Sequence, residues 1–279
     1  MKKSPLLMIF LLLIMGLPAL AADEASGRKY SFAVVPQFPA RIIQRDWVPL
    51  LEEINKLSGV ACEISHYSSI PQFEQGLEKG EPDFAYMNPY HQVLARRWQG
   101  YVPLVRDGSH QLRGILVVRQ DSPFTKIADL NNQVIAFPSP NALAASLYMR
   151  ALLVEQEKVS FTPAYVKTHS NVYRHVVLKK AAAGGGVDKT LKKETESLQE
   201  QLRVLYETPG LAPHPICVHP RVPQAVVERF VKTLLALGEN DRGKGILQTV
   251  AIGQPIPADY QRDYAVLEEL GLEKYLDKE

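Results

Sequence analysis

Apolar strand-like segments alternate with amphipathic helix-like segments along most of this 279-residue chain. Residues 30–36, 60–67 and 83–87 have the composition of buried strands, and residues 47–57 and 70–77 between them have the apolar spacing of helices. Parallel strands need a crossover connection, which is usually a helix. The alternation therefore predicts an α/β fold with a largely parallel sheet.

The alternation resumes after residue 113 and predicts a second α/β unit. Further strands are expected at residues 114–118, 134–137, 162–166, 202–206 and 216–218. Helices are expected from residue 127, from residue 141 through 153, from residue 170, and over 189–201, 223–237 and 259–275. Two such units imply two sheets, each with its own helices.

Extended strands rather than a flexible linker join the two units, at residues 113–118 and 214–218. The chain is therefore expected to form two lobes with a cleft between them. Residues 28–113 with 217–279 make the first predicted lobe, and residues 114–213 make the second. Ligands of open α/β sheets bind at the carboxyl ends of strands, and lobes that close are a common means of ligand capture.

The N-terminus has the pattern of a secretory signal peptide. Met1-Lys2-Lys3 precedes an apolar run over residues 6–15, and Ala19-Leu20-Ala21 supplies the small residues of a cleavage site. We expect residues 1–21 to be removed and the mature protein to be periplasmic, with an uncleaved anchor as the alternative. No cysteine follows the cleavage site, which disfavours a lipoprotein.

Composition excludes some classes of partner. The net charge is only +2, whereas nucleic-acid binders concentrate Lys and Arg on one face, so no nucleic acid is expected. The basic cluster Lys189, Lys192 and Lys193 is followed by Glu194 and Glu196, which predicts a solvated helix face.

Two cysteines, Cys62 and Cys217, occur far apart in apolar strand-like segments. An exported protein permits a disulfide between them, and two buried thiols are equally compatible with the pattern. Neither cysteine has the close Cys/His spacing of a metal site. We expect no metal and no cofactor.

The stretch over residues 134–146 predicts a buried strand that breaks at Pro138 and Pro140 into the N-terminus of a helix. The first N–H groups of a helix lack intrahelical partners and carry a partial positive charge. Such a helix start is a natural site for an anion. Its side chains decide what else it can hold.

Several short segments in this order resemble the phosphate/phosphite/phosphonate-binding family of periplasmic solute-binding proteins, the receptors of ATP-driven importers. They are Trp47-Val48-Pro49-Leu50, residues 83–89, Asp129-Leu130, Ala136-Phe137, Thr168-His169-Ser170 and residues 184–187. The resemblance covers nearly all of the mature chain. It implies a two-lobed, type II-like periplasmic-binding-protein fold and a receptor role.

The chain departs from that family at the expected anion site. A serine/threonine run is usual at the helix start, where this sequence has Ala142-Leu143-Ala144. The family's His-Asp pair is His169-Ser170 here, and an expected acidic residue near the glycine run is Ala183. Hydrogen bonds to charged groups are worth about 1.5–3 kcal/mol each. The departures therefore predict a less polar pocket.

The candidate ligand-binding residues are mostly aromatic or neutral and polar. They are Tyr67, Tyr86, Asn88, Tyr90, Ser139, Asn141, Ala142, His169, Ser170, Tyr173 and Arg174. Several have a structural alternative: one of the tyrosines in the core, a capping or buried His169, and helix N-caps at Ser139, Asn141 and Ser170. Gly184 to Gly186 fit either a close backbone approach to ligand or a tight loop.

These observations predict a monomeric binding protein that captures a small molecule between two lobes and delivers it to an inner-membrane permease. One alternative is a carrier of an apolar or amphipathic ligand for a transporter of another type. A second is a partner of a membrane sensor kinase. No Gly-x-Ser-x-Gly elbow, Walker loop or zinc spacing is present, so an enzyme is not expected.

Overall fold

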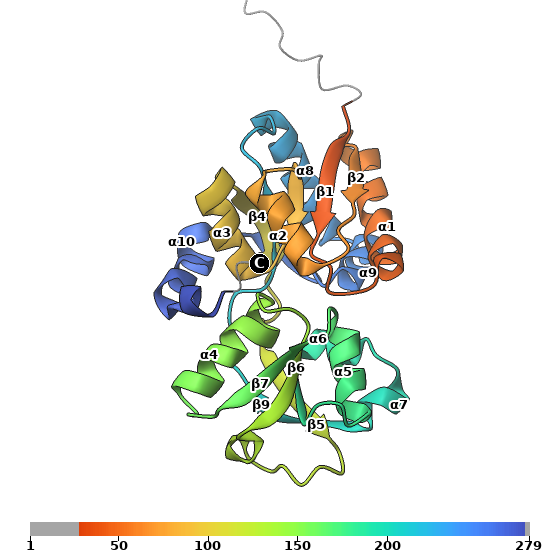
Figure 1. The fold of residues 1–279 in the computed structure, drawn as a ribbon. Coiled ribbons are helices and arrows are strands. Elements are labelled where there is room, and N and C mark those ends of the chain that lie inside the picture. Colours follow the sequence, from red (N-terminus) through yellow and green to blue (C-terminus); the bar gives the residue numbers. More distant parts are fainter. Residues whose placement is uncertain (1–27, 277–279) are drawn as a thin grey trace, which may run out of the picture.

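Two separate β-sheets organise residues 28–276, the part of the chain that the computed structural model describes (Figure 1). The predicted signal peptide, residues 1–21, lies outside the described residues. In the first sheet the strand order is β11-β4-β10-β3-β1-β2, and in the second it is β7-β6-β8-β5-β9. The two sheets and the helices on them form the upper and lower lobes of Figure 1.

The first sheet contains β1 (Tyr30–Val34), β2 (Cys62–Ser65), β3 (Phe84–Tyr86), β4 (Val102–Asp107), β10 (Pro215–Val218) and β11 (Pro255–Pro257). Its lobe carries α1 (Ala40–Ser58), α2 (Ile70–Glu78), α3 (Pro89–Gln99), α8 (Gln224–Leu237), α9 (Asp241–Thr249) and α10 (Tyr260–Asp263), with short 3₁₀ turns at Ala265–Leu270 and Leu272–Tyr275.

The second sheet contains β5 (Gly114–Arg119), β6 (Gln133–Phe137), β7 (Phe161–Tyr165), β8 (Ala183–Val187) and β9 (Leu202–Glu207). Its lobe carries the 3₁₀ turn η1 (Ile127–Leu130), the π-helix η2 (Leu143–Leu147), α4 (Tyr148–Glu155), α5 (His169–Val177), α6 (Asp188–Lys192) and α7 (Glu196–Gln199).

Both sheets are mixed, whereas mostly parallel sheets were predicted. β1 is parallel to β2 and β3, but β10 is antiparallel to β3 and β4. Likewise β6 is parallel to β7 and β8, but β5 is antiparallel to β8 and β9. The reason is that β5 and β10 are each the first strand after the chain crosses from the other lobe. They begin at the edge where the parallel strands end, and so run the opposite way.

The crossings lie just before the predicted segments. Residues 108–113 connect β4 to β5, and residues 208–214 connect β9 to β10. The two connections pair with each other once, because Leu112 and Leu211 exchange backbone hydrogen bonds of 2.8 and 2.9 Å. Residues 114–118 and 215–218, predicted as crossings, are instead strands within the two sheets.

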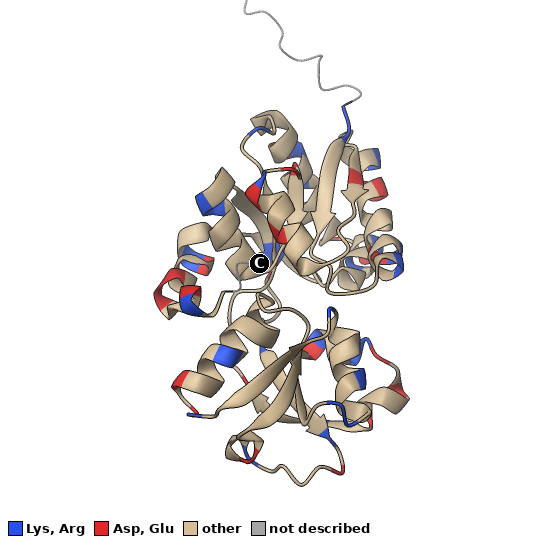
Figure 2. Cartoon of the chain, viewed as in Figure 1, with Lys and Arg blue, Asp and Glu red and all other residues tan. Residues whose placement is uncertain are grey.

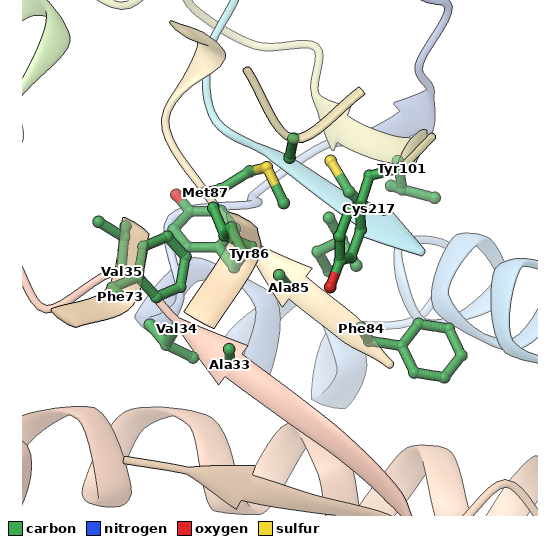
Figure 3. Close-up of a cluster of buried hydrophobic side chains, with 14 of the residues drawn as sticks. Ala33, Val34, Val35, Phe73, Phe84, Ala85, Tyr86, Met87, Tyr101 and Cys217 are labelled. Atoms are coloured by element: carbon green, nitrogen blue, oxygen red, sulfur yellow. The ribbon is translucent and has the colours of Figure 1, made fainter. Parts of the chain in front are cut away.

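Aromatic packing fixes α1 and α8 on the first sheet. Phe84 stacks on Phe230 of α8 with ring centroids 4.5 Å apart, and Phe32 lies 5.3 Å from Trp47 of α1. Figure 3 shows the side chains of β1 and β3 that form this core, from Ala33 and Phe84 to Val35 and Met87 at the carboxyl ends. Burial of such rings stabilises a fold by about 1.5–3 kcal/mol each.

The two cysteines are free thiols. Cys62 is on β2 and Cys217 on β10, and β1 and β3 lie between these strands. Three strand spacings of about 4.8 Å each exceed the roughly 7 Å over which two Cα atoms can be bridged. The sheet order therefore rules out the disulfide and leaves the other alternative, two thiols.

Candidate functional site

A small cavity lies where the end of β6 leads into η2, between the lobes. Its volume of about 10 Å³ is no larger than a single water molecule needs. We call it the helix-start cavity. It is lined by Val35, Gln37, Ile70, Asn88, Ala142, Leu143, Ala144, Ala145, His169, Val187 and His214.

The helix that begins here starts as a wide π turn and not as the predicted α-helix. The carbonyl of Ala142 accepts hydrogen bonds from the N–H groups of Ser146 (2.8 Å) and Leu147 (3.1 Å). The regular α-helix, α4, begins only at Tyr148. π turns of this kind often occur at functional sites.

Glycines in the second sheet let η2 lie directly on the strands. A Cβ atom at Gly185 would stand 2.0 Å from the carbonyl oxygen of Ala145, and one at Gly114 would stand 2.1 Å from that of Ala144. For Gly184 to Gly186 the sequence left two alternatives open, a tight loop or a close approach of the backbone to ligand. The structure has a buried strand, β8, and the close approach is to η2.

Both histidines at this cavity are held neutral. Burial lowers the pKa of His169 to about 4, and Nδ1 of its ring lies 3.2 Å from Oγ1 of Thr190. Burial, with nearby histidines and Lys189, lowers the pKa of His214 to about 3. The Nε2 atom of His214 lies 3.2 Å from Nε2 of Gln37. At neutral pH these two side chains present imidazole and not imidazolium.

A much larger cavity of about 650 Å³ adjoins the first on the side of the crossings. We call it the inner cavity; it shares Gln37, Val187 and His214 with the helix-start cavity. Its other lining residues are Phe38, Tyr86, Ser109, His110, Gln111, Leu112, Arg113, Ile115, Asp188, Lys189, Thr190, Lys192, Lys193, Glu207, Pro213 and Ala251. This volume is typical of small-molecule sites.

Lys189 of α6 is the most enclosed cation of the inner cavity. Its Nζ atom lies 3.3 Å from Nδ1 of His110 and 3.4 Å from the carbonyl oxygen of Ala251, both in the first lobe. Burial lowers the pKa of Lys189, which means that the ammonium group lacks full compensation in this structure. An anion placed beside it would favour the charged form.

His110 is held by Asp107, to which it is paired. Burial by itself would raise the pKa of Asp107, but hydrogen bonds from His110, Ser109 and the N–H of Gln254 lower it to about 2. The carboxylate is therefore ionised at neutral pH and fixes the position of the His110 ring. This pair forms the first-lobe wall opposite Lys189.

The prediction of a solvated basic face at α6 is wrong for one of the three lysines, Lys189. Lys189 is half-buried against the first lobe. Lys193 reaches Oδ2 of Asp46 at 3.2 Å and the carbonyl of Thr249 at 3.0 Å, and its Nζ atom lies 4.9 Å from the ring centre of Phe38. Lys192 and Lys193 are both exposed, as predicted, and Lys192 is paired with Asp188 at 2.6 Å.

A third cavity of about 670 Å³ lies beyond Lys193 and Phe38, which also line the inner cavity. We call it the outer cavity. Its remaining lining residues are Pro39, Arg41, Ile42, Arg45, Asp46, Thr168, Ser170, Asn171, Arg174, Glu194, Thr195 and Thr249.

The predicted ligand residues are divided among these cavities. Asn88, Ala142 and His169 line the helix-start cavity. Tyr86 lines the inner cavity, where its ring lies 5.4 Å from that of His214 and 4.7 Å from that of Trp47. Asn88 also caps α3, because its Oδ1 atom accepts a hydrogen bond from the N–H of His91.

Ser170 and Arg174 face the outer cavity. Ser170 donates a hydrogen bond to Glu194, and the N-cap of α5 is Thr168, which accepts from the N–H of Asn171. The adjacent residues His169 and Ser170 thus point into different cavities.

The other predicted residues line none of the three cavities. Tyr67 donates to Glu81 and packs edge-on against Phe73. Tyr173 is buried and donates to the carbonyl of Val187. Tyr90 and Ser139 are buried as well.

Asn141 also lies outside the cavities and connects the two lobes. Its Nδ2 atom donates to Oε2 of Glu74 at 3.0 Å, and its carbonyl accepts from Nδ2 of Asn88 at 3.3 Å. Both partners belong to the first lobe.

Sequence reasoning missed Gln37, His110, Arg113, Lys189 and His214. Arg113 and His214 did have a signal, since each stands at the start of a predicted crossing, and crossings border a cleft between lobes. No sequence signal pointed to Lys189, because the charged residues that follow it are typical of an ordinary surface helix.

Within residues 28–276, no helix is long and apolar enough to cross a membrane. The same residues contain no cluster of three His, Cys, Asp or Glu side chains that could hold a metal ion.

Comparison with known proteins places residues 32–264 in a family described as the periplasmic substrate-binding protein of ABC phosphonate transporters. No curated protein sequence matches the chain. Many solved structures share its fold.

One similar structure is a binding-protein component of an ABC phosphonate transporter from Pseudomonas aeruginosa, with a TM-score of 0.78 and 13% identity over 87% of this chain and 85% of that one. Another is PhnD1 from Prochlorococcus marinus in complex with methylphosphonate, with a TM-score of 0.78 and 16% identity over 87% and 97% of the two chains. A Xanthomonas citri protein bound to ATP has a TM-score of 0.71 and 17% identity over 88% and 98%. These likenesses confirm the predicted two-lobed fold.

Proposed function

The chain belongs to the family of periplasmic substrate-binding proteins of ABC phosphonate transporters, and from this premise we propose that it captures a small organic anion in the inner cavity and delivers it to an inner-membrane permease. The observation that most strongly supports an anionic ligand is the half-buried ammonium group of Lys189, which faces a cavity of about 650 Å³. Arg113, Lys192 and Lys193 also line this cavity, against the carboxylates of Asp188 and Glu207.

The apolar part of the lining favours an amphipathic anion. Phe38, Tyr86, Leu112 and Pro213 form walls of the same cavity as the cations. Apolar walls with a few polar groups hold a ligand with an apolar body and fix its orientation through its charged end. A short-chain alkylphosphonate has both parts.

A phosphonate site at the start of η2 would lack its usual donors. Ala142, Leu143, Ala144 and Ala145 bring no hydroxyl group to the helix-start cavity, and His169 and His214 are neutral there. Its volume of about 10 Å³ also leaves no room for a phosphonate group in this arrangement of the lobes. We therefore propose a ligand whose charged end is held by Lys189 and its neighbours.

The geometry supports binding without catalysis. A nucleophile and its base must lie within hydrogen-bond reach. Ser170 donates to Glu194 on the side of the outer cavity, whereas His169 contacts Thr190 at the helix-start cavity. We propose that the protein is not an enzyme.

Three further properties belong to the same proposal. The protein acts as a monomer in the periplasm after removal of residues 1–21. Its lobes have close to the predicted boundaries, with residues 28–113 and 215–276, which include all of β10, in one and residues 114–213 in the other. They open about the paired crossings at Leu112 and Leu211.

Native mass spectrometry of the protein as purified tests the proposal most directly, because binding proteins often retain their ligand. We expect a bound organic anion of a few hundred daltons, or micromolar calorimetric binding of hexylphosphonate. Tighter binding of methylphosphonate or phosphate than of hexylphosphonate would contradict the amphipathic ligand. Retention of a neutral lipid would instead favour the lipid carrier.

A further inference from the structure

The outer cavity is built by both lobes, on a side of the molecule that the proposed ligand site does not use. The first turns of α1, from the first lobe, supply Arg41 and Arg45, and α5, from the second, supplies Arg174. Figure 2 shows basic residues on both helices, and Figure 1 shows α1 and α5 on the same side of the molecule.

Positive charge exceeds negative charge in this cavity. Four cations, Arg41, Arg45, Arg174 and Lys193, face two carboxylates, Asp46 and Glu194. The net charge of the lining is therefore +2.

Both carboxylates already have partners. Asp46 accepts from Nε of Arg45 at 2.7 Å and from Lys193 at 3.2 Å, and Glu194 accepts from the hydroxyl of Ser170. Among residues 28–276, in contrast, Arg41 and Arg174 are exposed, and their guanidinium groups have no hydrogen-bond or ion-pair partner. The excess charge thus resides on two guanidinium groups, one from each lobe.

Guanidinium groups present paired N–H donors that match the oxygens of a phosphate or phosphonate group. A cavity of about 670 Å³ has room for such a group, and Asn171 and Thr195 add neutral polar atoms to its lining. We propose that the outer cavity is a second anion site, in which Arg41 and Arg174 bind a phosphate or phosphonate group from opposite lobes.

This site is separate from the inner cavity. Lys193 and Phe38 stand between the two cavities, and Lys193 is tied to Asp46 and Thr249 of the first lobe. Occupation of the outer cavity therefore does not require a ligand beside Lys189, and the proposal does not depend on the ligand proposed above.

The test is an NMR titration of the ¹⁵N-labelled protein with inorganic pyrophosphate, a compact multivalent anion. We expect chemical-shift changes of the Nε–Hε groups of Arg41 and Arg174 and of the amides around them. Changes confined to Arg113 and residues 187–192 would overturn the outer site while leaving the inner one supported. No change anywhere would overturn the outer site and count against anion binding in the inner cavity as well.

Two double variants distinguish a specific anion site from non-specific electrostatic attraction of the anion to the protein. The double variant Arg41→Gln/Arg174→Gln should weaken pyrophosphate binding at the outer cavity by about a hundredfold, since each charged contact accounts for about tenfold. Arg229→Gln/Lys232→Gln removes the same charge from exposed positions on α8 and should change the affinity by less than about twofold. Equal losses in the two double variants would mean that net charge alone attracts the anion, and would overturn the proposal.

Discussion

The helix-start cavity and the inner cavity share three residues, Gln37, Val187 and His214, but differ in volume and in charge. The first holds about 10 Å³ and is lined by aliphatic groups, two amide side chains and neutral histidines. The second holds about 650 Å³ and contains four Lys or Arg side chains. An anion is therefore expected to bind to the basic side chains at α6 and to Arg113 at the crossing from β4 to β5, and not at the start of η2.

The largest expected effect comes from protonating the histidines of the smaller cavity. The folded pKa values of about 4 for His169 and about 3 for His214 lie below the unfolded value of about 6.5. Above pH 6.5 these two histidines are mostly neutral in both the folded and the unfolded protein. As the pH falls, the histidines of the unfolded protein take up protons first. Stability should therefore fall by about 4 kcal/mol between pH 7 and pH 5, the sum over both residues.

Urea unfolding at several pH values measures this loss. His169→Gln and His214→Gln should each flatten the dependence by about half, whereas His66→Gln, at an exposed position, should leave it steep. A profile that stays flat from pH 7 to pH 5 in the unmodified protein would show that the two imidazoles are not held neutral.

The second effect tests how η2 is seated. Gly185→Ala places a Cβ atom 2.0 Å from the carbonyl oxygen of Ala145 and 2.6 Å from the ring of Phe137. The strand or η2 must shift, so we expect a loss of about 3 kcal/mol in the free energy of unfolding. Gly245→Ala is the matched control, because nothing lies within 4 Å of its new Cβ atom in α9 and alanine favours helix. Equal stabilities of the two variants would refute the close contact.

The third effect separates the cavities by ligand affinity. Lys189→Gln keeps a polar side chain but removes the enclosed charge, so calorimetric affinity for hexylphosphonate should fall by about 30-fold, equivalent to about 2 kcal/mol. Lys232→Gln, on the exposed face of α8, controls for net charge. An unchanged affinity in Lys189→Gln would place the charged end of the ligand elsewhere.

The smallest expected effect comes from a variant that makes the helix-start cavity more polar, and so more similar in chemistry to the inner cavity. Ala142→Ser/Ala144→Ser introduces two hydroxyl groups at the helix-start cavity, and affinity for methylphosphonate should rise about tenfold when the lobes open enough to admit it. Ala236→Ser, at an exposed position of α8, should leave it unchanged. No gain in the double variant would mean that the space at η2, and not its chemistry, excludes the phosphonate.

The alternation of strands and helices could be predicted from sequence because apolar periodicity is local. Strands β1, β3, β6 and β7 fall within a residue or two of their predicted places. The direction of β5 and β10 could not be predicted, since it depends on the lobe from which each strand enters. The π turn of η2 could not be predicted either, because η2 packs against Gly114 and Gly185, which are remote from it in sequence.

The candidate site was predicted less well than the fold. Tyr86, Asn88, Ala142 and His169 were expected beside a cavity from their places at strand and helix ends. The lysines of α6 were not, since periodicity identifies a charged face without indicating what lies opposite it. Asp46 and Thr249, which fix Lys193, are more than fifty residues away from it in the chain.

The sheet order also has a consequence for how the protein is made. The proposed export would bring the chain to oxidants while it is still unfolded, and an unfolded chain can join Cys62 to Cys217 because nothing then holds them apart. Once joined, these thiols cannot occupy strands separated by two others. Folding must therefore outpace oxidation, and the native state afterwards protects Cys217 by burial. The strand arrangement therefore means that a chain oxidised between Cys62 and Cys217 before it folds cannot reach the native state until that disulfide is reduced.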